Sequence, residues 1–318
     1  MRILLTGSSG WLGRFLAPRL RAVGHTVIGL DVAPGPDTTV VGSIADASLI
    51  RQTFAEYEVE AVIHSAALHK PDISRYDAQA FVAVNVTGTL NLLEAALAAG
   101  NDRFVFTSTT SLMISAAIRS GGAPEAAWLT EEMAPLEPRN IYGVTKLAAE
   151  HLCRIFHLEH GLPVTVLRTG RFFPEDDDTL AGDGLNLKAN EFLHRRLTVE
   201  DAAEAHVVAL QRAPELGFET FILSAPTPFA RADCGELSID AAAVVERYFP
   251  SASALYAERG WSLPKRIDRV YSAEKAQRLL GFRCRTDFAA VLEALGRGED
   301  PPIGHDPSYT SPKEAQSR

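Results

Sequence analysis

Cysteine is scarce in this chain: 318 residues include three, Cys153, Cys234 and Cys284, and no Cys-x-x-Cys spacing. Disulfide-stapled secreted domains and cysteine-ligated zinc modules need more cysteines at closer spacing. The histidines show no metal-ligand spacing with a convincing third ligand either. We therefore expect reduced structural thiols, no metal site and a cytoplasmic location.

Long apolar runs and positive charge are lacking as well. No uninterrupted apolar run approaches the roughly 20 residues of a membrane-spanning helix. Residues 1–5 are too short for the apolar region of a signal peptide. The net charge of −9 at pH 7 argues against general binding to nucleic acid or to an anionic membrane surface. Hydrophobic residues make up 46% of the chain and charged residues 22%, the composition of an ordinary globular protein whose partner is a small molecule.

Strand-like and helix-like segments alternate over the first two thirds of the chain. Most of the strand-like segments are unbroken apolar runs, as expected for strands buried on both faces. We expect strands at 2–6, 26–31, 39–42, 61–66, 103–108 and 163–168, with helices at 11–23, 47–57, 81–99 and 141–160. Such alternation predicts an α/β fold with a doubly wound parallel sheet.

A glycine-rich turn follows the first expected strand. Its sequence, Thr-Gly-Ser-Ser-Gly-Trp-Leu-Gly, spans residues 6–13 and places glycines at 7, 10 and 13. Small residues at this point let the backbone turn tightly and approach a pyrophosphate at a helix N-terminus, where free N–H groups and the helix dipole favour anions. The strand–turn–helix context predicts a dinucleotide site on a Rossmann-type domain.

Asp31 ends the second expected strand. An acid at this distance from the glycine turn hydrogen-bonds the adenosine ribose hydroxyls and repels a 2′-phosphate. No arginine follows Asp31 before Arg51, so the sequence favours NAD over NADP. The simpler alternative is a carboxylate that caps the turn beginning at Pro34.

Tyr142 and Lys146 are four residues apart in an expected helix, which places both side chains on one face. A phenol has a pKa of about 10, and a neighbouring ammonium lowers it. A tyrosine activated in this way can exchange a proton with a substrate hydroxyl or carbonyl. With 7 Tyr and 6 Lys in the chain, chance produces such a spacing about one time in eight, so the pair needs support from other motifs.

That support comes from three further segments in fixed order: Ala-Val-Ile-His-Ser-Ala-Ala at 61–67, Asn-Val-Thr-Gly-Thr at 85–89 and Phe-Val-Phe-Thr-Ser-Thr at 104–109. Together with the glycine turn and the Tyr–Lys pair, they make the chain resemble the extended short-chain dehydrogenase/reductases of the NAD-dependent epimerase/dehydratase family, of which UDP-glucose 4-epimerase is a familiar member. The resemblance covers about residues 1–225. Residues 271–282 also look like the family's C-terminal signature.

The resemblance implies a role for each matching position. Tyr142 would be the acid/base, Lys146 would hold the nicotinamide ribose and lower the tyrosine pKa, and Thr109 would hydrogen-bond the reacting oxygen, with Ser108 the less favoured candidate. His64 would be structural. The cofactor-binding residues would be Gly7, Gly10, Trp11, Leu12, Gly13, Asp31, Ile44, Ala66, Ala67, Asn85, Tyr142 and Lys146. Local backbone hydrogen bonding by Asn85 and an ordinary strand end at Thr109 remain the simpler alternatives.

Four departures from the family pattern bear on the substrate. Thr109 is followed by Thr110 and Ser111 rather than by Asp-Glu, which disfavours dehydration because that reaction needs an acid and a base at neighbouring carbons. Met113-Ile114 replaces the usual Tyr-Gly, and Ser43 replaces the usual adenine-contacting acid.

Arg171 is the fourth departure, since the epimerases typically have Asn near this position. A guanidinium offers a planar donor for a carboxylate or phosphate. An ion pair with the acids at 175–178 is equally compatible with the sequence, and Arg195-Arg196 could face an anionic substrate or simply end a helix. The short interval between Arg171 and the helix expected from residue 199 suggests a substrate smaller than a nucleotide-sugar, or a nucleotide held differently.

These patterns divide the chain into a Rossmann domain at 1–170, with sheet and helix returning at about 197–224, a small C-terminal substrate lobe at 171–196 and 225–300, and a mobile tail at 301–318. We expect an NAD-dependent epimerase or oxidoreductase that acts by hydride transfer at a carbinol of a sugar or sugar-derived substrate. A dehydrogenase that releases NADH, and a non-catalytic NAD-sensing protein, are the alternatives. The family also implies a homodimer through the helices at 81–99 and 141–160.

Overall fold

The computed structural model of the chain describes residues 1–120, 122–176 and 183–315. Its central feature is a parallel sheet of seven strands in the order β3-β2-β1-β4-β5-β7-β8. The strands are β1 (Arg2–Thr6), β2 (Thr26–Asp31), β3 (Val40–Val41), β4 (Ala61–His64), β5 (Phe104–Thr109), β7 (Val164–Thr169) and β8 (Phe218–Leu223). The predicted doubly wound parallel sheet is confirmed. Its strand order reverses between β1 and β4, where such sheets bind their ligands.

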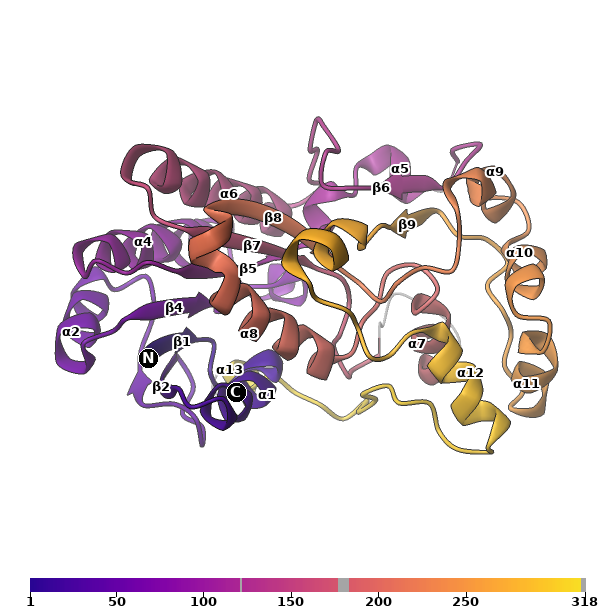
Figure 1. The fold of residues 1–318 in the computed structure, drawn as a ribbon, viewed down its shortest axis with the longest axis horizontal. Helices are drawn as coiled ribbons and strands as arrows, with labels where there is room; N and C mark the ends of the chain where they lie inside the picture. The colour runs from indigo at the N-terminus through magenta and orange to yellow at the C-terminus, as the bar shows by residue number, and fades with distance from the viewer. Residues whose placement is uncertain (121, 177–182, 316–318) are drawn as a thin grey trace.

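Helices cover both faces of the sheet (Figure 1). Buried side chains of α1 (Trp11–Ala22) and α8 (Val199–Leu216) pack on one face. On the other face lie α2 (Ala47–Tyr57), α4 (Gly88–Ala98) and α6 (Ile141–His160). The apolar strand cores are therefore removed from water on both sides, which is why their sequences show unbroken hydrophobic runs.

The helix ends follow local chemistry that the sequence already carried. The Asn140 side chain accepts a hydrogen bond from the Gly143 N–H at the start of α6, and the helix ends at Gly161 with a φ of 72°. Asp46 caps α2 and Thr198 caps α8 in the same manner. Such caps satisfy N–H groups that have no partner inside the helix. The start of α6 fixes where Tyr142 stands in the first turn.

The helix expected at 81–99 begins earlier and is interrupted. It consists of α3 (Ala78–Phe81), a π-helical turn (Val82–Thr87) and α4. By length and composition alone Ala78–Ala98 could cross a membrane, with a mean hydropathy of 1.4, but half of that window is buried inside the fold. Its contacts with α2 and α6 are those of a core helix.

A smaller lobe with its own apolar core lies beyond the sheet. Its helices are α7 (Gly184–Glu191), α9 (Cys234–Leu237), α10 (Ala241–Tyr248), α11 (Ala252–Glu258) and α12 (Phe288–Gly296). The helix α7 lies in the short interval between Arg171 and α8. The lobe also takes in β6 (Ala127–Leu129), which pairs in parallel with β9 (Arg269–Tyr271), so a segment from before residue 170 completes it.

The C-terminal segment packs against the body of the protein. Ile303 is buried in the core of the lobe. From there the chain runs back to the sheet domain, where Tyr309 contacts Trp11 of α1, and it then forms α13 (Pro312–Ala315) (Figure 1). The mobility that the sequence predicts for residues 301–318 stays a prediction, and residues 301–315 make the specific contacts described below.

Candidate functional site

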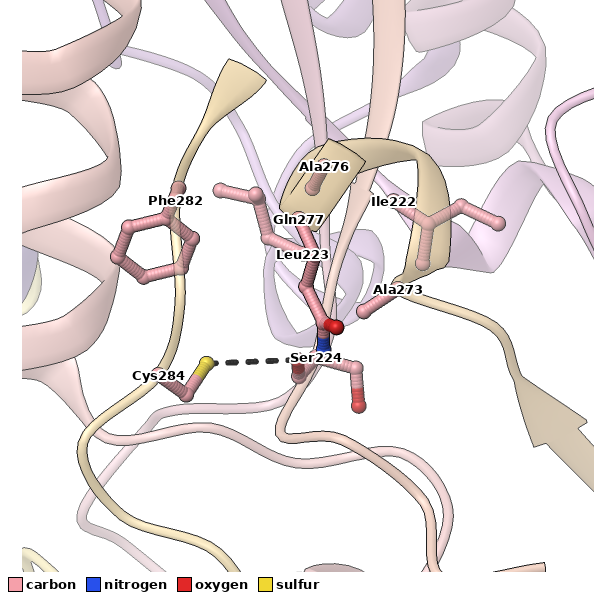
Figure 2. A pocket seen from close by; sticks show the side chains of 8 residues that line it. All are labelled: Ile222, Leu223, Ser224, Ala273, Ala276, Gln277, Phe282 and Cys284. Atoms are coloured by element: carbon pink, nitrogen blue, oxygen red, sulfur yellow. Dashed lines mark hydrogen bonds between the residues drawn. The ribbon is translucent and has the colours of Figure 1, made fainter. Parts of the chain in front are cut away.

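One small hollow lies between β8 and the π-helical turn Ala276–Leu280 (Figure 2). Its walls are mostly apolar, and Cys284 Sγ donates a hydrogen bond of 3.4 Å to the carbonyl of Ser224. The crevice has no room for even one water molecule. It is a packing gap, and the candidate site lies elsewhere.

A large groove of about 1330 Å³ opens at the carboxyl ends of the strands and extends to the lobe. Pockets for single small ligands commonly measure about 300–1,000 Å³, so this groove can hold a dinucleotide and a second molecule. Twelve of the predicted site residues line it: Gly7, Gly10, Trp11, Leu12, Asp31, Ile44, Ala66, Ala67, Thr109, Tyr142, Lys146 and Arg171. Gly13 and Asn85 lie behind its wall.

The glycine turn has the shape that a pyrophosphate requires. Gly7 has a φ of 77°, which favours glycine. A Cβ on Gly13 would lie 2.3 Å from the carbonyl oxygen of Gly7, so only glycine allows α1 to approach β1 this closely. Gly10 begins α1, and among the described residues no side chain caps it. The first N–H groups of α1 are thus suited to an anionic phosphate, which fits NAD.

Asp31 links the end of β2 to this turn. One carboxylate oxygen accepts the Ser9 N–H at 3.0 Å, and the other accepts the Ala33 N–H at 3.0 Å. The bond to Ala33 is a local turn contact, similar to the alternative in which Asp31 only caps the turn that begins at Pro34. The first is not local, and it places the carboxylate against the glycine turn, where the adenosine ribose of a dinucleotide would lie.

The remaining cofactor positions form the walls of the same groove. Ile44 is almost fully buried, and its carbonyl accepts a hydrogen bond from Asn91. The Ala66 N–H donates to the Thr6 hydroxyl, which ties the end of β4 to β1. Asn85, on the π-helical turn, bonds both the N–H and the carbonyl of Leu68. Because Leu68 is 17 residues away, Asn85 fixes the segment after β4 rather than its own backbone.

Tyr142 and Thr109 come together at the base of the groove. Both side chains are more than nine-tenths buried. Burial raises the pKa of Tyr142 to about 12, a hydrogen bond with Thr109 opposes this rise, and the nearby carboxylate of Asp72 adds to it. Thr109 Oγ1 also accepts the Ser111 N–H, which orients the hydroxyl. The pair can therefore hold a substrate oxygen and exchange a proton with it.

Lys146 lines the same groove, and its proposed contact with the nicotinamide ribose stays a prediction. Its ammonium donates to the Thr107 carbonyl at 2.7 Å and lies 3.9 Å from the centre of the Phe106 ring. Burial lowers its own pKa to about 7. The pKa of Tyr142 is set by burial, Thr109 and Asp72 rather than by Lys146. The four-residue spacing places Tyr142 and Lys146 on one face of α6. Desolvation nevertheless has the largest effect on the pKa of each residue.

Two residues considered from the sequence are held in structural networks. His64 bonds the hydroxyls of Thr6 and Thr89, and burial holds its pKa well below the usual value. Ser108 donates at 2.5 Å to Glu150, which also forms a buried ion pair with Arg168. Its hydroxyl is thus committed to that pair, which leaves Thr109 as the hydroxyl beside Tyr142.

Arg171 lies at the substrate end of the groove, with Glu191 as its ion-pair partner at 3.2 Å. The sequence also suggested an ion pair with the acids at 175–178, of which 177 and 178 lie outside the described residues. Arg195 and Arg196 pair with the same carboxylate, at 2.9 and 2.7 Å. Arg195 lines the groove, whereas Arg196 is buried and bonds the Phe173 carbonyl.

Sequence reasoning missed several residues that the fold brings to the groove. The His69 ring lies 5.8 Å from the Tyr142 ring and 5.8 Å from the Phe173 ring. Asp72 is buried nearby, and Tyr309 comes from the C-terminal segment. Nothing in their local patterns signals a site, because each reaches the groove through a loop or through chain returning from the lobe.

The parallel sheet carries a glycine turn suited to a dinucleotide, and buried Tyr142 and Thr109 line the same groove. These features define a nicotinamide-dependent oxidoreductase. Residues 3–183, more than half of the chain, match the model of the NAD-dependent epimerase/dehydratase family. The chain belongs to this family. It is an enzyme of the extended short-chain dehydrogenase/reductase type, and its cofactor is NAD.

Relatives span nearly the whole chain. The UDP-glucose 4-epimerase of Rhizobium meliloti (strain 1021) is 29% identical over 329 residues, covering 92% of this chain and 95% of the relative. The dTDP-glucose 4,6-dehydratase of Streptomyces antibioticus is 30% identical, covering 91% and 89%. A short-chain dehydrogenase/reductase superfamily protein from Agrobacterium tumefaciens, solved with bound NAD, is 25% identical with a TM-score of 0.65, covering 93% and 96%.

Proposed function

We propose that the protein is an NAD-dependent epimerase or oxidoreductase that acts by hydride transfer at a carbinol of a sugar-derived substrate. The observation that carries this proposal is that the buried residues Tyr142 and Thr109 line the same groove as the glycine turn. Both long relatives are named for sugar-nucleotide chemistry, which supports a sugar-linked substrate.

The chain's own residues would divide the work. When bound, NAD supplies the carbon that accepts and returns a hydride. Gly7, Gly10, Trp11, Leu12 and Gly13 would hold its pyrophosphate end, and Asp31 its ribose. Lys146 would anchor the other ribose. Tyr142 would take the proton of the substrate hydroxyl or return one to a carbonyl, and Thr109 would hold the same oxygen. With a pKa raised to about 12 by burial, Tyr142 starts as the proton donor, and the Thr109 hydrogen bond favours its conversion to a base.

The substrate end of the groove supports an anionic substrate. Arg119, Arg139 and Arg269 line it together. Burial lowers the pKa of Arg139, and the cations of Arg119 and Arg269 lower it further. Like charges crowded in this way favour an anion between them. A carboxylate of a sugar acid or the phosphate of a nucleotide-sugar would provide it, with Arg171 and Arg195 alongside.

Dehydration is the reaction that the site supports least. Thr110 and Ser111 follow Thr109 where dehydratases carry an acid pair; Thr110 donates its hydroxyl to the Thr169 carbonyl, and the Ser111 N–H bonds Thr109. Epimerase and dehydrogenase share the hydride-transfer step and differ in whether NADH leaves. The rival from another class is an NAD-sensing protein without catalysis, and the intact set of Thr109, Tyr142 and Lys146 speaks against it.

A substrate panel with the Tyr142→Phe variant tests the proposal. Neutral sugars, sugar acids and nucleotide-sugars are each assayed for NADH absorbance and for epimer formation. We expect turnover with an anionic substrate and a loss of kcat of about 10²–10⁴-fold in the variant, with NAD binding retained. Denaturing the purified native protein then measures retained nucleotide: stoichiometric NAD supports an epimerase and an empty site a dehydrogenase. Unchanged turnover in Tyr142→Phe would refute the catalytic assignment.

We further propose a cytoplasmic homodimer. The helices expected to form its interface carry exposed apolar side chains: Val82 is 45% exposed, Val144 48%, Ile155 42% and Leu158 65%. Val82 belongs to the stretch that runs into α4, and the other three belong to α6. A second copy would remove this apolar surface from water, which supports a four-helix interface.

A further inference from the structure

We propose that residues 307–315, here called the C-terminal strap, form the outer wall of the NAD site and slow the release of the cofactor. Six strap residues line the groove: Pro307, Tyr309, Ser311, Pro312, Lys313 and Glu314. The strap would act as a clamp that links the substrate lobe to the cofactor domain. The inference depends on NAD binding alone and holds for an epimerase or a dehydrogenase.

The strap starts from a fixed point in the lobe. Ile303 is buried in the lobe's core. Next along the chain, His305 contacts the Lys188 ammonium at 2.6 Å, and the Asp306 N–H donates to the Pro174 carbonyl at 3.0 Å. These contacts hold the beginning of the strap against the segment that follows β7, so the strap crosses to the other lobe from a rigid base.

The middle of the strap lies on the glycine turn. The Tyr309 ring meets the Trp11 ring edge-on, with 5.0 Å between their centres, and the Arg14 guanidinium lies 5.8 Å from the Tyr309 ring. Trp11 is itself held by a hydrogen bond from its indole to the Phe172 carbonyl. Aromatic and cation–π contacts of this kind are attractive. Tyr309 thus covers the helix end that is suited to the pyrophosphate.

The end of the strap is held by two ion pairs at the far side of the groove. Lys313 pairs with the buried carboxylate of Asp72 and donates to the Ala67 carbonyl at 3.3 Å. Glu314 pairs with Arg75 at 2.5 Å. Asp72 and Arg75 belong to the segment after β4, next to Ala66 and Ala67. The strap therefore spans the groove from the glycine turn to the nicotinamide end.

The strap bounds the groove rather than filling it, because about 1330 Å³ remains with the strap in place. The strap would block the dissociation of a dinucleotide that lies between the strap and the sheet. Release would then require the ion pairs and the Tyr309 contact to break first, so the dissociation rate would be limited by strap opening.

Truncation after Asp306 is the first test, and it leaves Ile303 and the core of the lobe intact. We expect at least a tenfold faster dissociation of NAD, measured by stopped-flow displacement with excess nucleotide, and less nucleotide co-purifying with the protein. Thermal unfolding of the nucleotide-free protein should change little, which separates this effect from misfolding. An unchanged dissociation rate would overturn the clamp. Tighter binding after truncation would also overturn it and show that the strap blocks the site.

A charge-reversal cycle provides the second test. Arg75→Glu and Glu314→Arg should each speed NAD dissociation severalfold and increase protease cleavage within the strap, because like charges then face each other. The double variant Arg75→Glu/Glu314→Arg should restore both readouts towards the native values. Arg212→Glu, which breaks an exposed ion pair with Glu215 on α8, is the matched control and should change neither. Failure of the double variant to restore slow release would refute the pairing.

Discussion

Individual residues of this site are governed more by desolvation than by spacing. The four-residue interval between Tyr142 and Lys146 predicted a phenol activated by an ammonium. In the structure, burial raises the pKa of Tyr142 to about 12 and lowers that of Lys146 to about 7, because desolvation disfavours the charged form of each group. Thr109 is the neighbour that opposes the rise in the pKa of Tyr142. The catalytic roles of Tyr142, Thr109 and Lys146 stay predictions, and in the structure the Lys146 ammonium donates a hydrogen bond to the Thr107 carbonyl.

The depressed pKa of Lys146 makes a prediction about stability. Its pKa falls from 10.5 to about 7 on folding. Between these values the unfolded chain binds the proton and the folded protein does not, so the free energy of unfolding should rise with pH, by up to about 1.4 kcal/mol per pH unit. Urea unfolding of the nucleotide-free protein at pH 7, 8 and 9 measures this. Lys146→Met should remove the rise, whereas Lys265→Met, at an exposed position, should keep it. Parallel stability curves for native and Lys146→Met proteins would contradict the assignment.

At the scale of elements, the decisive feature is the junction of β1 and α1. Close approach of the helix to the strand depends on Gly13, whose Cβ would meet the backbone oxygens of Gly7 and Ser8 at 2.3 and 2.6 Å. The π-helical turn before α4 is the second such feature, since it aims Asn85 at Leu68. π-helical turns inside α-helices frequently occur at functional sites.

Gly13→Ala should therefore damage both stability and binding. Backbone atoms cannot move aside as a flexible side chain can, so we expect a loss of about 1–3 kcal/mol in the free energy of unfolding and NAD binding weakened at least tenfold. Thermal unfolding and nucleotide titration measure the two effects. Gly235→Ala in α9 is the matched control, because its Cβ would meet nothing within 4 Å; it should leave NAD binding unchanged and stability equal or higher. Normal NAD binding by Gly13→Ala would disprove the close-packed turn.

At the scale of the whole molecule, two lobes share one groove and the chain crosses between them repeatedly. Residues 126–129 come from the first half of the chain but pack in the C-terminal lobe. The strap follows the lobe in the sequence but lines the groove at the sheet. The Arg-lined end of the groove is assembled from α5 (Ala116–Ser120), the loop before α6 and β9. Substrate recognition is thus a property of the assembled lobes.

The proposed dimer makes a prediction at this scale. Ile155→Glu and Leu158→Glu place charges on the exposed apolar face of α6, and we expect light scattering after size-exclusion chromatography to change from the mass of two chains to one. Ile239→Glu is the matched control, since Ile239 is 75% exposed but lies in the lobe; it should leave the mass unchanged. A native protein with the mass of a single chain would refute the dimer.

Short-range features of the sequence were sufficient to predict the sheet, the family and the cofactor. Apolar runs of strand length, capping residues such as Asn140, and the glycines at 7, 10 and 13 act over a few residues, so they can be recognised before folding. The roles of the individual site residues stay predictions. The surroundings of the reacting groups depended on the folded chain: burial shifted the pKa values of Tyr142 and Lys146, loops brought His69 and Asp72 to the groove, and the C-terminal segment lined it. These depend on contacts between residues as far apart as Trp11 and Tyr309, for which the local sequence carries no signal.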